Sequence, residues 1–272
     1  MRCAVLGDPI EHSLSPVLHR AGYAALGLAW EYDAHRVPLG GLAAFLAGLG
    51  PEWRGLSLTM PLKREALAAA PEVTDRARLA GAANTLVLDA GRPVLADNTD
   101  LPGAVAAVRE RYDGPVTAGT VLGGGATAAS TGLALAELGA TSVTVLARSR
   151  ARAAEAAAAI AAHPSHPRVE VGDLADDPVH GEVLVSTIPA AAQDAGLLAR
   201  CADVPVLFEV VYDPWPTPLV AAAAEHAVVV GGLDLLVHQA LLQLELFTGA
   251  AAPLAALRAA GESALAARRA AG

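Results

Sequence analysis

Apolar and polar positions along the 272-residue chain form two kinds of segment that follow one another in turn. Short apolar runs predict strands near residues 2–7, 31–37 and 55–60, and two further runs, NTLVLD and RPVLAD, flank an AGR turn and predict a hairpin. Segments with helical spacing lie between the strands; one begins at SPVLHRAGYAALG, and another runs from Asp100 to Arg111. This alternation predicts an α/β protein.

The same alternation continues after the Gly- and Pro-containing segment YDGPVTAG, which reads as a break between domains. Further strands are expected near 120–125 (TVLGGG), 142–148, 168–172, 182–188, 204–211 and 227–231, and helices over 126–138, 151–162, 235–248 and 253–270. We therefore expect two α/β domains, residues 1–101 and residues 102–236. The strands of the second domain are complete by residue 236, so the last helices, 237–272, are expected to return to the first domain.

Composition narrows the class of protein. Hydrophobic residues make up 54% of the chain, but no apolar run reaches the length of about 18 residues that a membrane span needs. The segment MRCAVLGDPI is too short for a signal peptide, and Cys3 and Cys201 lie in apolar runs typical of buried thiols. We expect a cytoplasmic protein. A net charge of −9 without a basic stripe argues against a nucleic-acid partner, and no histidine spacing indicates a metal site.

A glycine-rich stretch, TVLGGGATAAS, follows the break and combines a strand, a turn and the start of a helix. Gly123, Gly125 and Ala128 fit the pattern G-x-G-x-x-A. The first glycine permits a tight turn, the second lets the backbone approach a pyrophosphate, and the small third residue lets the helix pack on the strand. The helix N-terminus then faces the anion. The stretch therefore predicts a dinucleotide site.

Three arginines stand about 20 residues further on, where an NAD site usually has Asp or Glu. Arg148, Arg150 and Arg152, with Ser149 between them, are suited to a 2′-phosphate, which guanidinium groups bind through charge-assisted hydrogen bonds. This favours NADP over NAD. Helical spacing predicts that Arg148 and Arg152 share a face, which leaves Arg150 the weakest candidate.

Two hydroxyls occur in the opening segment GDPIEHSLSPVLH. Ser13 and Ser15 point to the same side if the segment is extended, so both can meet one ligand. Pro16 suits the first helical position, which makes Ser15 the expected N-cap. Such a pair of hydroxyls at a helix start can hold a carboxylate.

Polar residues also follow several strands of the first domain. Lys63 comes just after the strand-like run in SLTMPLK, Asn84 opens the strand in GAANT, and Asp97, Asn98 and Asp100 end the strand in LADNTD. If these strand ends form one rim, Lys63, Asn84 and Asp100 converge.

Seven short blocks together, in this order and spacing, resemble the shikimate dehydrogenase family: GDPIEHSLSPVLH, TMPLK, GAANTL, DNTD, the glycine loop, VVYDPWPTPL and LLVHQA. The resemblance covers nearly the whole chain. It implies an NADP-dependent oxidoreductase that interconverts 3-dehydroshikimate and shikimate in aromatic amino acid biosynthesis. It also implies an N-terminal α/β substrate domain, a Rossmann-type NADP-binding domain, and C-terminal helices that pack back on the first domain.

The resemblance also implies roles for individual residues. The catalytic pair is Lys63, as the proton donor and acceptor, and Asp100, which orients it and hydrogen-bonds a substrate hydroxyl. The substrate-binding residues are Ser13, Ser15, Thr59, Asn84, Tyr212 and Gln239. The cofactor-binding residues are Gly123, Gly124, Gly125, Ala126, Thr127, Arg148, Ser149, Arg152 and Gly232. We expect a monomer or a homodimer.

The chain departs from the family pattern at five positions: Ser57 stands where Asn is frequent, Ala126 where glycine is frequent, Ala129 where a basic residue is frequent, Leu235 where methionine is frequent and Asp234 where glycine is usual. Asp234 either lies near the nicotinamide, where an acid would disfavour NADPH, or points to solvent. Two alternatives stay open. One is a related dehydrogenase that acts on quinate with NAD. The other is a non-catalytic ligand-binding protein on the same fold, against which the presence of both Lys63 and Asp100 argues.

Overall fold

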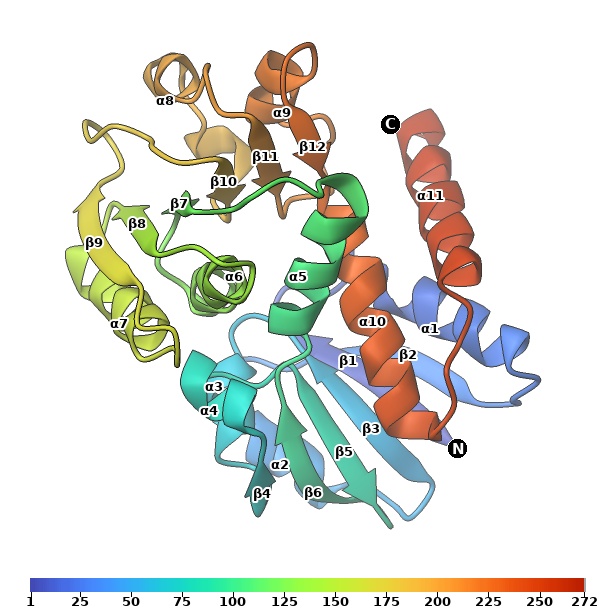
Figure 1. Cartoon of the computed structure of the whole chain (residues 1–272). Coiled ribbons are helices and arrows are strands. Elements are labelled where there is room, and N and C mark those ends of the chain that lie inside the picture. The colour runs from blue at the N-terminus through green and yellow to red at the C-terminus, as the bar shows by residue number, and fades with distance from the viewer. Residues whose placement is uncertain (272) are drawn as a thin grey trace. The chain divides into compact units, whose positions relative to one another are not determined.

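The computed structural model describes residues 1–271, which form two compact units (Figure 1). The first unit contains Met1–Thr99 and the chain from Leu236 onward, and the second contains Asp100–Leu235. Each unit has its own six-stranded sheet covered by helices. The predicted α/β class is confirmed.

The first sheet has the strand order β2-β1-β3-β5-β6-β4 and mixes parallel and antiparallel pairs. Its interior strand β1, between β2 and β3, is an almost continuous apolar run, as expected for a strand covered on both faces. The predicted hairpin is formed by β5 and β6, and its two turn residues, Ala90 and Gly91, both have positive φ. The strands are β1 Arg2–Gly7, β2 Glu31–Arg36, β3 Trp53–Leu58, β4 Glu72–Val73, β5 Thr85–Asp89 and β6 Arg92–Asp97.

Helices from both ends of the sequence cover this sheet. They are α1 Ser15–Ala25, α2 Leu42–Ala47, α3 Lys63–Leu67, α4 Asp75–Ala80, α10 Gly232–Thr248 and α11 Leu254–Ala271. The aromatic ring of Phe247 in α10 lies directly against β3, because a side chain at Gly55 would overlap it. The helix α11 packs on α1, so the C-terminal helices return to the first unit as predicted.

The second sheet is parallel throughout, with the order β12-β11-β10-β7-β8-β9. This is the Rossmann order, in which β8 and β9 are added on one side of β7, and β10, β11 and β12 on its other side. The helix α6 packs between α5 and α7, and α8 and α9 pack together near β11. The elements are α5 Asp100–Arg111, β7 Ala118–Leu122, α6 Ala126–Glu137, β8 Ser142–Ala147, α7 Arg150–Ala161, β9 Arg168–Asp173, β10 Val183–Ser186, a 3₁₀ turn over Ala190–Ala192, α8 Ala195–Arg200, β11 Val206–Glu209, α9 Pro218–Ala223 and β12 Val228–Val230.

Two predicted helix starts are wrong by one or two residues. Ser15 is not an N-cap, because Leu14 already has helical backbone angles and no side chain caps α1; instead the Ser13 Oγ accepts a hydrogen bond from the Ser15 backbone N–H over 3.3 Å. The helix α7 begins at Arg150, with Ser149 as its N-cap. Arg148 therefore precedes the helix, and it cannot share a helical face with Arg152.

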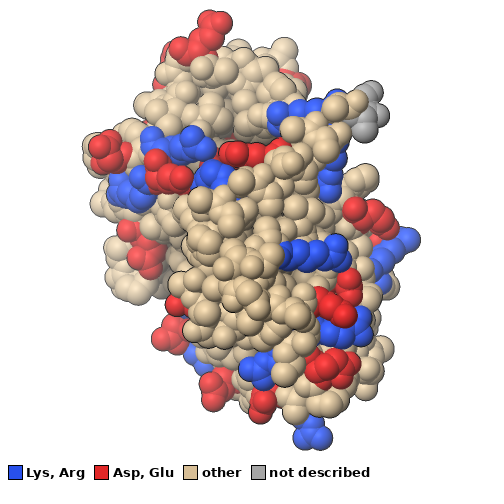
Figure 2. All heavy atoms as spheres, turned by 90° about the vertical axis from the view of Figure 1, so that its right-hand side faces the viewer, with Lys and Arg blue, Asp and Glu red and all other residues tan. Residues whose placement is uncertain are grey.

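Two features of the structure agree with the composition: the mixture of surface charges and the burial of the cysteine thiols. On the face drawn in Figure 2, lysine and arginine side chains are interspersed with aspartate and glutamate. Cys3 and Cys201 are both buried free thiols, as predicted, and burial raises the pKa of each to about 11. Within residues 1–271, no helix has both the length and the apolar character that a membrane span needs. The same described part of the chain holds no cluster of metal-ligating side chains.

Candidate functional site

Lys63 lies on a segment that is fixed on both sides by the first sheet. The segment follows β3, and α3 begins at Lys63. On one side, the Thr59 backbone N–H donates to the Leu6 carbonyl oxygen over 2.9 Å, and on the other side the Lys63 carbonyl oxygen accepts the Ala83 N–H over 2.8 Å. Three parts of the chain thus meet at one edge of the sheet. They are the end of β1, the segment after β3 and the segment before β5.

Asn84 is buried at this edge, and both ends of its side-chain amide are hydrogen-bonded. It is 2% exposed. Its Nδ2 donates to Thr99 Oγ1 over 3.0 Å and to Gln239 Oε1 over 3.3 Å, and its Oδ1 accepts the Thr99 backbone N–H over 2.8 Å. The structure therefore brings together Asn84 and Gln239, two of the predicted substrate residues, although they are far apart in sequence.

Gln243 lies one helical turn beyond Gln239 in α10 and is hydrogen-bonded to the backbone of Asn84. Its Nε2 donates to the Asn84 carbonyl oxygen over 3.1 Å and to Thr85 Oγ1 over 2.9 Å. Its Oε1 accepts a hydrogen bond from Ser57 Oγ over 2.7 Å, and Ser57 Oγ in turn accepts from the Tyr32 hydroxyl over 2.6 Å. All of these groups are buried, so the network is a fixed part of the core.

His19 completes this network from α1. Its Nε2 lies 3.2 Å from Gln243 Oε1, and its ring stacks on Tyr32 with the ring centres 4.0 Å apart. Burial lowers the pKa of His19 to about 3, so the ring is neutral and donates to Gln243. The neighbours of the His19 ring include this amide oxygen and the aromatic rings of Tyr32 and Phe247.

Asp97 anchors the strand end that leads to Asp100. Burial favours the neutral acid, but hydrogen bonds from Arg76, Thr74 and the Asn98 backbone outweigh it, and the pKa of Asp97 is lowered. The side chain is therefore an ionised carboxylate paired with Arg76. The anchored turn of Asn98 and Thr99 leads directly into Asp100, which is 6% exposed and opens α5.

Ser13 lies on the loop that leaves β1, and Ser15 is the first residue of α1. This loop starts at the same edge of the sheet, because the Asp8 backbone N–H donates to the Met60 carbonyl oxygen over 2.9 Å. Ser15 is buried and Ser13 is half-buried. One acceptor position of the Ser13 hydroxyl is used by the Ser15 N–H, and the hydroxyl can still donate to a ligand.

In the second unit, three glycines form the turn after β7, and at two of them a side chain would clash with its neighbours. Gly123 has φ = 116°, and a Cβ there would overlap Thr187 Oγ1. A Cβ on Gly124 would lie 2.7 Å from the Ala153 nitrogen, whereas Gly125 faces open space and is the N-cap of α6. The backbone amides of Ala126 and Thr127 begin that helix, so the turn is shaped for an anionic phosphate.

Arg148, Ser149 and Arg152 surround the start of α7 and are exposed. The Ser149 Oγ caps the helix by accepting the Arg152 backbone N–H over 3.4 Å. The first turn of α7 contains no acidic residue, so no carboxylate within that turn neutralises the arginine side chains at the start of the helix. This set of side chains suits a 2′-phosphate, and the glycine turn suits the pyrophosphate of a dinucleotide.

The carboxyl ends of β11 and β12 carry Tyr212 and Gly232. Tyr212 is half-buried, just beyond β11. Its segment is held by Glu209, which is fully buried and accepts the Val211 N–H over 3.0 Å and the Thr217 hydroxyl over 3.0 Å. A side chain at Gly232 would overlap the Val210 carbonyl oxygen, so the two strand ends pack backbone against backbone.

Two family models match the sequence. The "Shikimate dehydrogenase substrate binding domain" matches residues 5–86, and the "Shikimate 5'-dehydrogenase C-terminal domain" matches residues 232–260. A relative from Symbiobacterium thermophilum, named "Shikimate dehydrogenase (NADP(+))", is 34% identical over 96% of this chain and 93% of its own length.

The chain belongs to the shikimate dehydrogenase family.

Solved structures of shikimate dehydrogenases agree with this assignment. The Mycobacterium tuberculosis enzyme is 43% identical and superimposes with a TM-score of 0.85 over 97% of this chain and 99% of that one. The enzyme from Thermus thermophilus, solved in complex with NADP(H) and shikimate, is 30% identical with a TM-score of 0.80 over 97% and 99% of the two chains. The predicted family is thus confirmed.

Asp234, where the shikimate dehydrogenase pattern usually has glycine, does not point to solvent. Its side chain is buried, with one carboxylate oxygen accepting from Arg111 NH2 over 2.9 Å and the other accepting the Gly231 backbone N–H over 2.9 Å. Of the two placements left open for Asp234, the solvent-facing one is therefore excluded, because a cation from α5 and a backbone amide both hold the carboxylate in place.

Three residues that support the candidate site were not singled out from the sequence: Gln243, Arg76 and Glu209. Gln243 occupies a helix whose neighbours Leu242 and Leu244 are apolar, and a lone polar residue at a core position was the available signal. Glu209 gave a similar signal, as the one charged residue in the apolar run VLFEVV, whereas Arg76 gave none.

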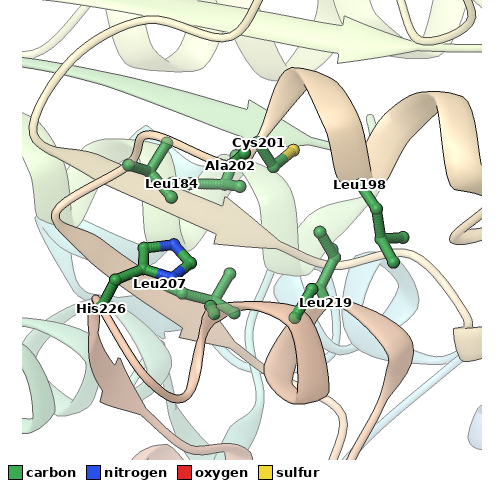
Figure 3. A pocket seen from close by; sticks show the side chains of 10 residues that line it. Leu184, Leu198, Cys201, Ala202, Leu207, Leu219 and His226 are labelled. Atoms are coloured by element: carbon green, nitrogen blue, oxygen red, sulfur yellow. The ribbon is translucent and has the colours of Figure 1, made fainter.

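An apolar pocket lies elsewhere in the second unit, between α8, α9 and the sheet (Figure 3). Its walls include Leu184, Leu198, Leu207, Leu219, Cys201 and His226. It holds about 50 Å³, which is too small for a nucleotide or a six-membered ring acid, and none of the predicted site residues lines it.

Proposed function

We propose that this protein is an NADP-dependent shikimate dehydrogenase that reversibly reduces 3-dehydroshikimate to shikimate. One observation carries the proposal: a lysine at the start of α3 is tied through Ala83 to Asn84, and Asn84 is bonded to Thr99, the residue before Asp100. These contacts support a site in which an amine, an amide and a carboxyl group come from segments next to neighbouring strands of one sheet, where an alcohol and a carbonyl can be recognised.

The substrate is a ring acid with several hydroxyls, and the candidate residues match those groups. Ser13 and Ser15 offer hydroxyl donors to its carboxylate. Asn84 and Gln239 share a hydrogen bond of 3.3 Å that a ring hydroxyl can join, because each amide offers both a donor and an acceptor. Thr59 and Tyr212 supply further hydroxyls.

When bound, NADPH supplies a hydride to the carbonyl carbon of 3-dehydroshikimate, and NADP⁺ accepts one from shikimate. Lys63 delivers a proton to the carbonyl oxygen in the first direction and removes it from the alcohol in the other. Asp100 orients the Lys63 ammonium and accepts a hydrogen bond from a neighbouring hydroxyl. The bonded frame of Asn84, Thr99 and Asp97 keeps this edge of the sheet in place during the reaction.

We assign the two units to the two reactants. The first unit, with Met1–Thr99 and the C-terminal helices, binds the substrate, and Asp100–Leu235 binds NADP. The glycine turn after β7 receives the pyrophosphate, and Arg148, Ser149 and Arg152 receive the 2′-phosphate. We further propose that the enzyme works in the cytoplasm, in aromatic amino acid biosynthesis, as a monomer or a homodimer.

Steady-state oxidation assays test this function. Purified protein is given shikimate or quinate with NADP⁺ or NAD⁺, and the formation of the reduced cofactor is followed by its near-ultraviolet absorbance. We expect kcat/KM to be highest for shikimate with NADP⁺. A preference for quinate with NAD⁺ would establish the related quinate dehydrogenase instead, and nucleotide binding without turnover on either acid would establish a binding protein.

A further inference from the structure

Asp234 and Arg111 form an ion pair within the second unit that the proposed chemistry does not use. Arg111 is the last residue of α5, and Asp234 lies in the first turn of α10. The carboxylate side chain is 7% exposed and the guanidinium side chain is 46% exposed. An acid this deeply buried is stable as a carboxylate only when it is paired, and Arg111 with the Gly231 amide supplies that pairing.

The topology places this pair in the half of the sheet that receives the nicotinamide. A Rossmann sheet has two mononucleotide-binding halves, which meet between β7 and β10. The glycine turn and the arginines at the end of β8 occupy the half that takes the adenosine with its 2′-phosphate. The nicotinamide nucleotide therefore lies over the carboxyl ends of β10, β11 and β12. Asp234 follows the end of β12 by a few residues, with its carboxylate bonded to the Gly231 N–H.

The charge near this end of the sheet matters because the two forms of the cofactor differ in charge at the nicotinamide. The ring of NADP⁺ is a cation and the ring of NADPH is neutral. An unpaired carboxylate nearby would stabilise the oxidised ring and thereby favour NADP⁺ over NADPH, whereas an unpaired guanidinium would do the opposite.

We propose that Arg111 is a positioning residue that neutralises Asp234, so that the second unit binds NADPH and NADP⁺ without an electrostatic bias from this acid. The inference rests on the proposed NADP-dependent function. It explains how this chain accommodates an acid at a position where glycine is usual: the pair carries no net charge, and Asp234 fixes the Gly231 amide while Arg111 cancels its field.

The test compares the dissociation constants of NADPH and NADP⁺, measured by nucleotide fluorescence and by calorimetry, for wild type and three variants. In Arg111→Met, the ratio Kd(NADPH)/Kd(NADP⁺) should rise by about threefold or more. In Asp234→Asn, which keeps an oxygen for the Gly231 N–H, the ratio should fall, and by less, because the guanidinium is half-exposed and screened by solvent. In the double variant, the ratio should return to within about twofold of the wild-type ratio.

The opposite signs separate charge from structure. A merely structural pair would weaken both nucleotides together and leave the ratio unchanged in every variant, which would overturn the proposal. So would a ratio that moves in the same direction in both single variants. If Arg111→Met does not fold, the fall predicted for Asp234→Asn still decides. Arg109→Met, which removes another arginine from the same helix, is the control and should leave the ratio at the wild-type value.

The binding measurement also separates this proposal from the proposed function. If the wild-type protein binds neither nucleotide, the assignment of NADP itself fails. If it binds both and the ratio does not respond to the charge changes, the function stands and the role of Arg111 is refuted. Thermal unfolding of each variant, without nucleotide, reports whether the fold is kept.

Discussion

The side-chain amide of Gln243 donates a hydrogen bond to the backbone carbonyl oxygen of Asn84 over 3.1 Å, across 159 positions of sequence. This contact ties the C-terminal helix α10 to the strand edge on which the candidate substrate residues lie. Because Gln243 also bonds Thr85, Ser57 and His19, it couples the position of Asn84 to a wholly buried network.

Gln243→Leu should therefore weaken substrate binding more than turnover. The apolar side chain leaves buried partners unsatisfied, each at a cost of about 1–3 kcal/mol, and frees Asn84 to shift. We expect KM for shikimate to rise about tenfold, which corresponds to about 1.4 kcal/mol, with a much smaller change in kcat. Glu245→Gln, an exposed change on the same helix, is the control. An unchanged KM in a folded Gln243→Leu protein would show that the network is only structural.

Replacement of Lys63 by alanine should lower kcat about 100-fold or more while shikimate still binds, because the reaction loses its proton donor and acceptor. Lys63→Arg should not restore activity, since the guanidinium keeps its proton. Steady-state kinetics measure the rate, and calorimetric titration with shikimate measures binding. Arg64→Met, the neighbouring exposed cation, should stay close to wild type. Near-normal turnover in Lys63→Ala would remove Lys63 from the mechanism.

Arg152→Met should raise KM for NADP⁺ by about tenfold or more and leave KM for NAD⁺ nearly unchanged. Hydrogen bonds to charged groups contribute about 1.5–3 kcal/mol, and only NADP⁺ carries the 2′-phosphate. Arg148→Met should act in the same direction, and Arg150→Met should act least. Equal losses with both cofactors would indicate that these arginines support the fold of the loop and do not recognise the phosphate.

His19 should make stability depend on pH. Burial lowers its pKa in the folded protein to about 3, whereas an unfolded histidine titrates near about 6.5. Between these values the unfolded chain binds more protons, so the free energy of unfolding falls as the pH is lowered. From about pH 7.5 to about pH 5.5 the loss due to His19 is about 1.4 kcal/mol.

Urea unfolding at the two pH values measures this loss. In His19→Gln, the difference between the free energies of unfolding at the two pH values should be smaller than in wild type by that amount. The exposed His226→Gln variant should keep the wild-type difference. A difference that is the same in His19→Gln and wild type would mean that His19 does not stay neutral in the folded protein.

The second unit was predictable from the sequence because its signals are local. Each strand of its parallel sheet is a short apolar run followed by a helix, and the glycine turn with Gly123 lies within one strand–turn–helix segment. The predicted elements therefore agree with the structure to within a few residues. Short helices such as α3 and α8 were not individually identified, because five or six residues carry no clear helical period.

The candidate site was predictable only where residues follow strand ends. Lys63 and Asn84 were expected at one edge, and their segments do meet there. Gln243 was not expected, since its partners come from strands near the start of the chain. The buried position of Asp234 depends on Arg111, another contact between distant residues. The start of α1 depends on the backbone angles of Leu14, which no side-chain pattern reveals.

The first unit is built from two separated stretches of chain, and this has a consequence for its synthesis. The second unit is one continuous stretch, so it can fold as soon as it leaves the ribosome. The first sheet emerges earlier, but the amide of Gln243 and the helix that packs on α1 are translated last. The first unit is therefore synthesised first but completed last. Until α10 has been translated, the strand edge that carries Asn84 lacks its hydrogen bond from Gln243.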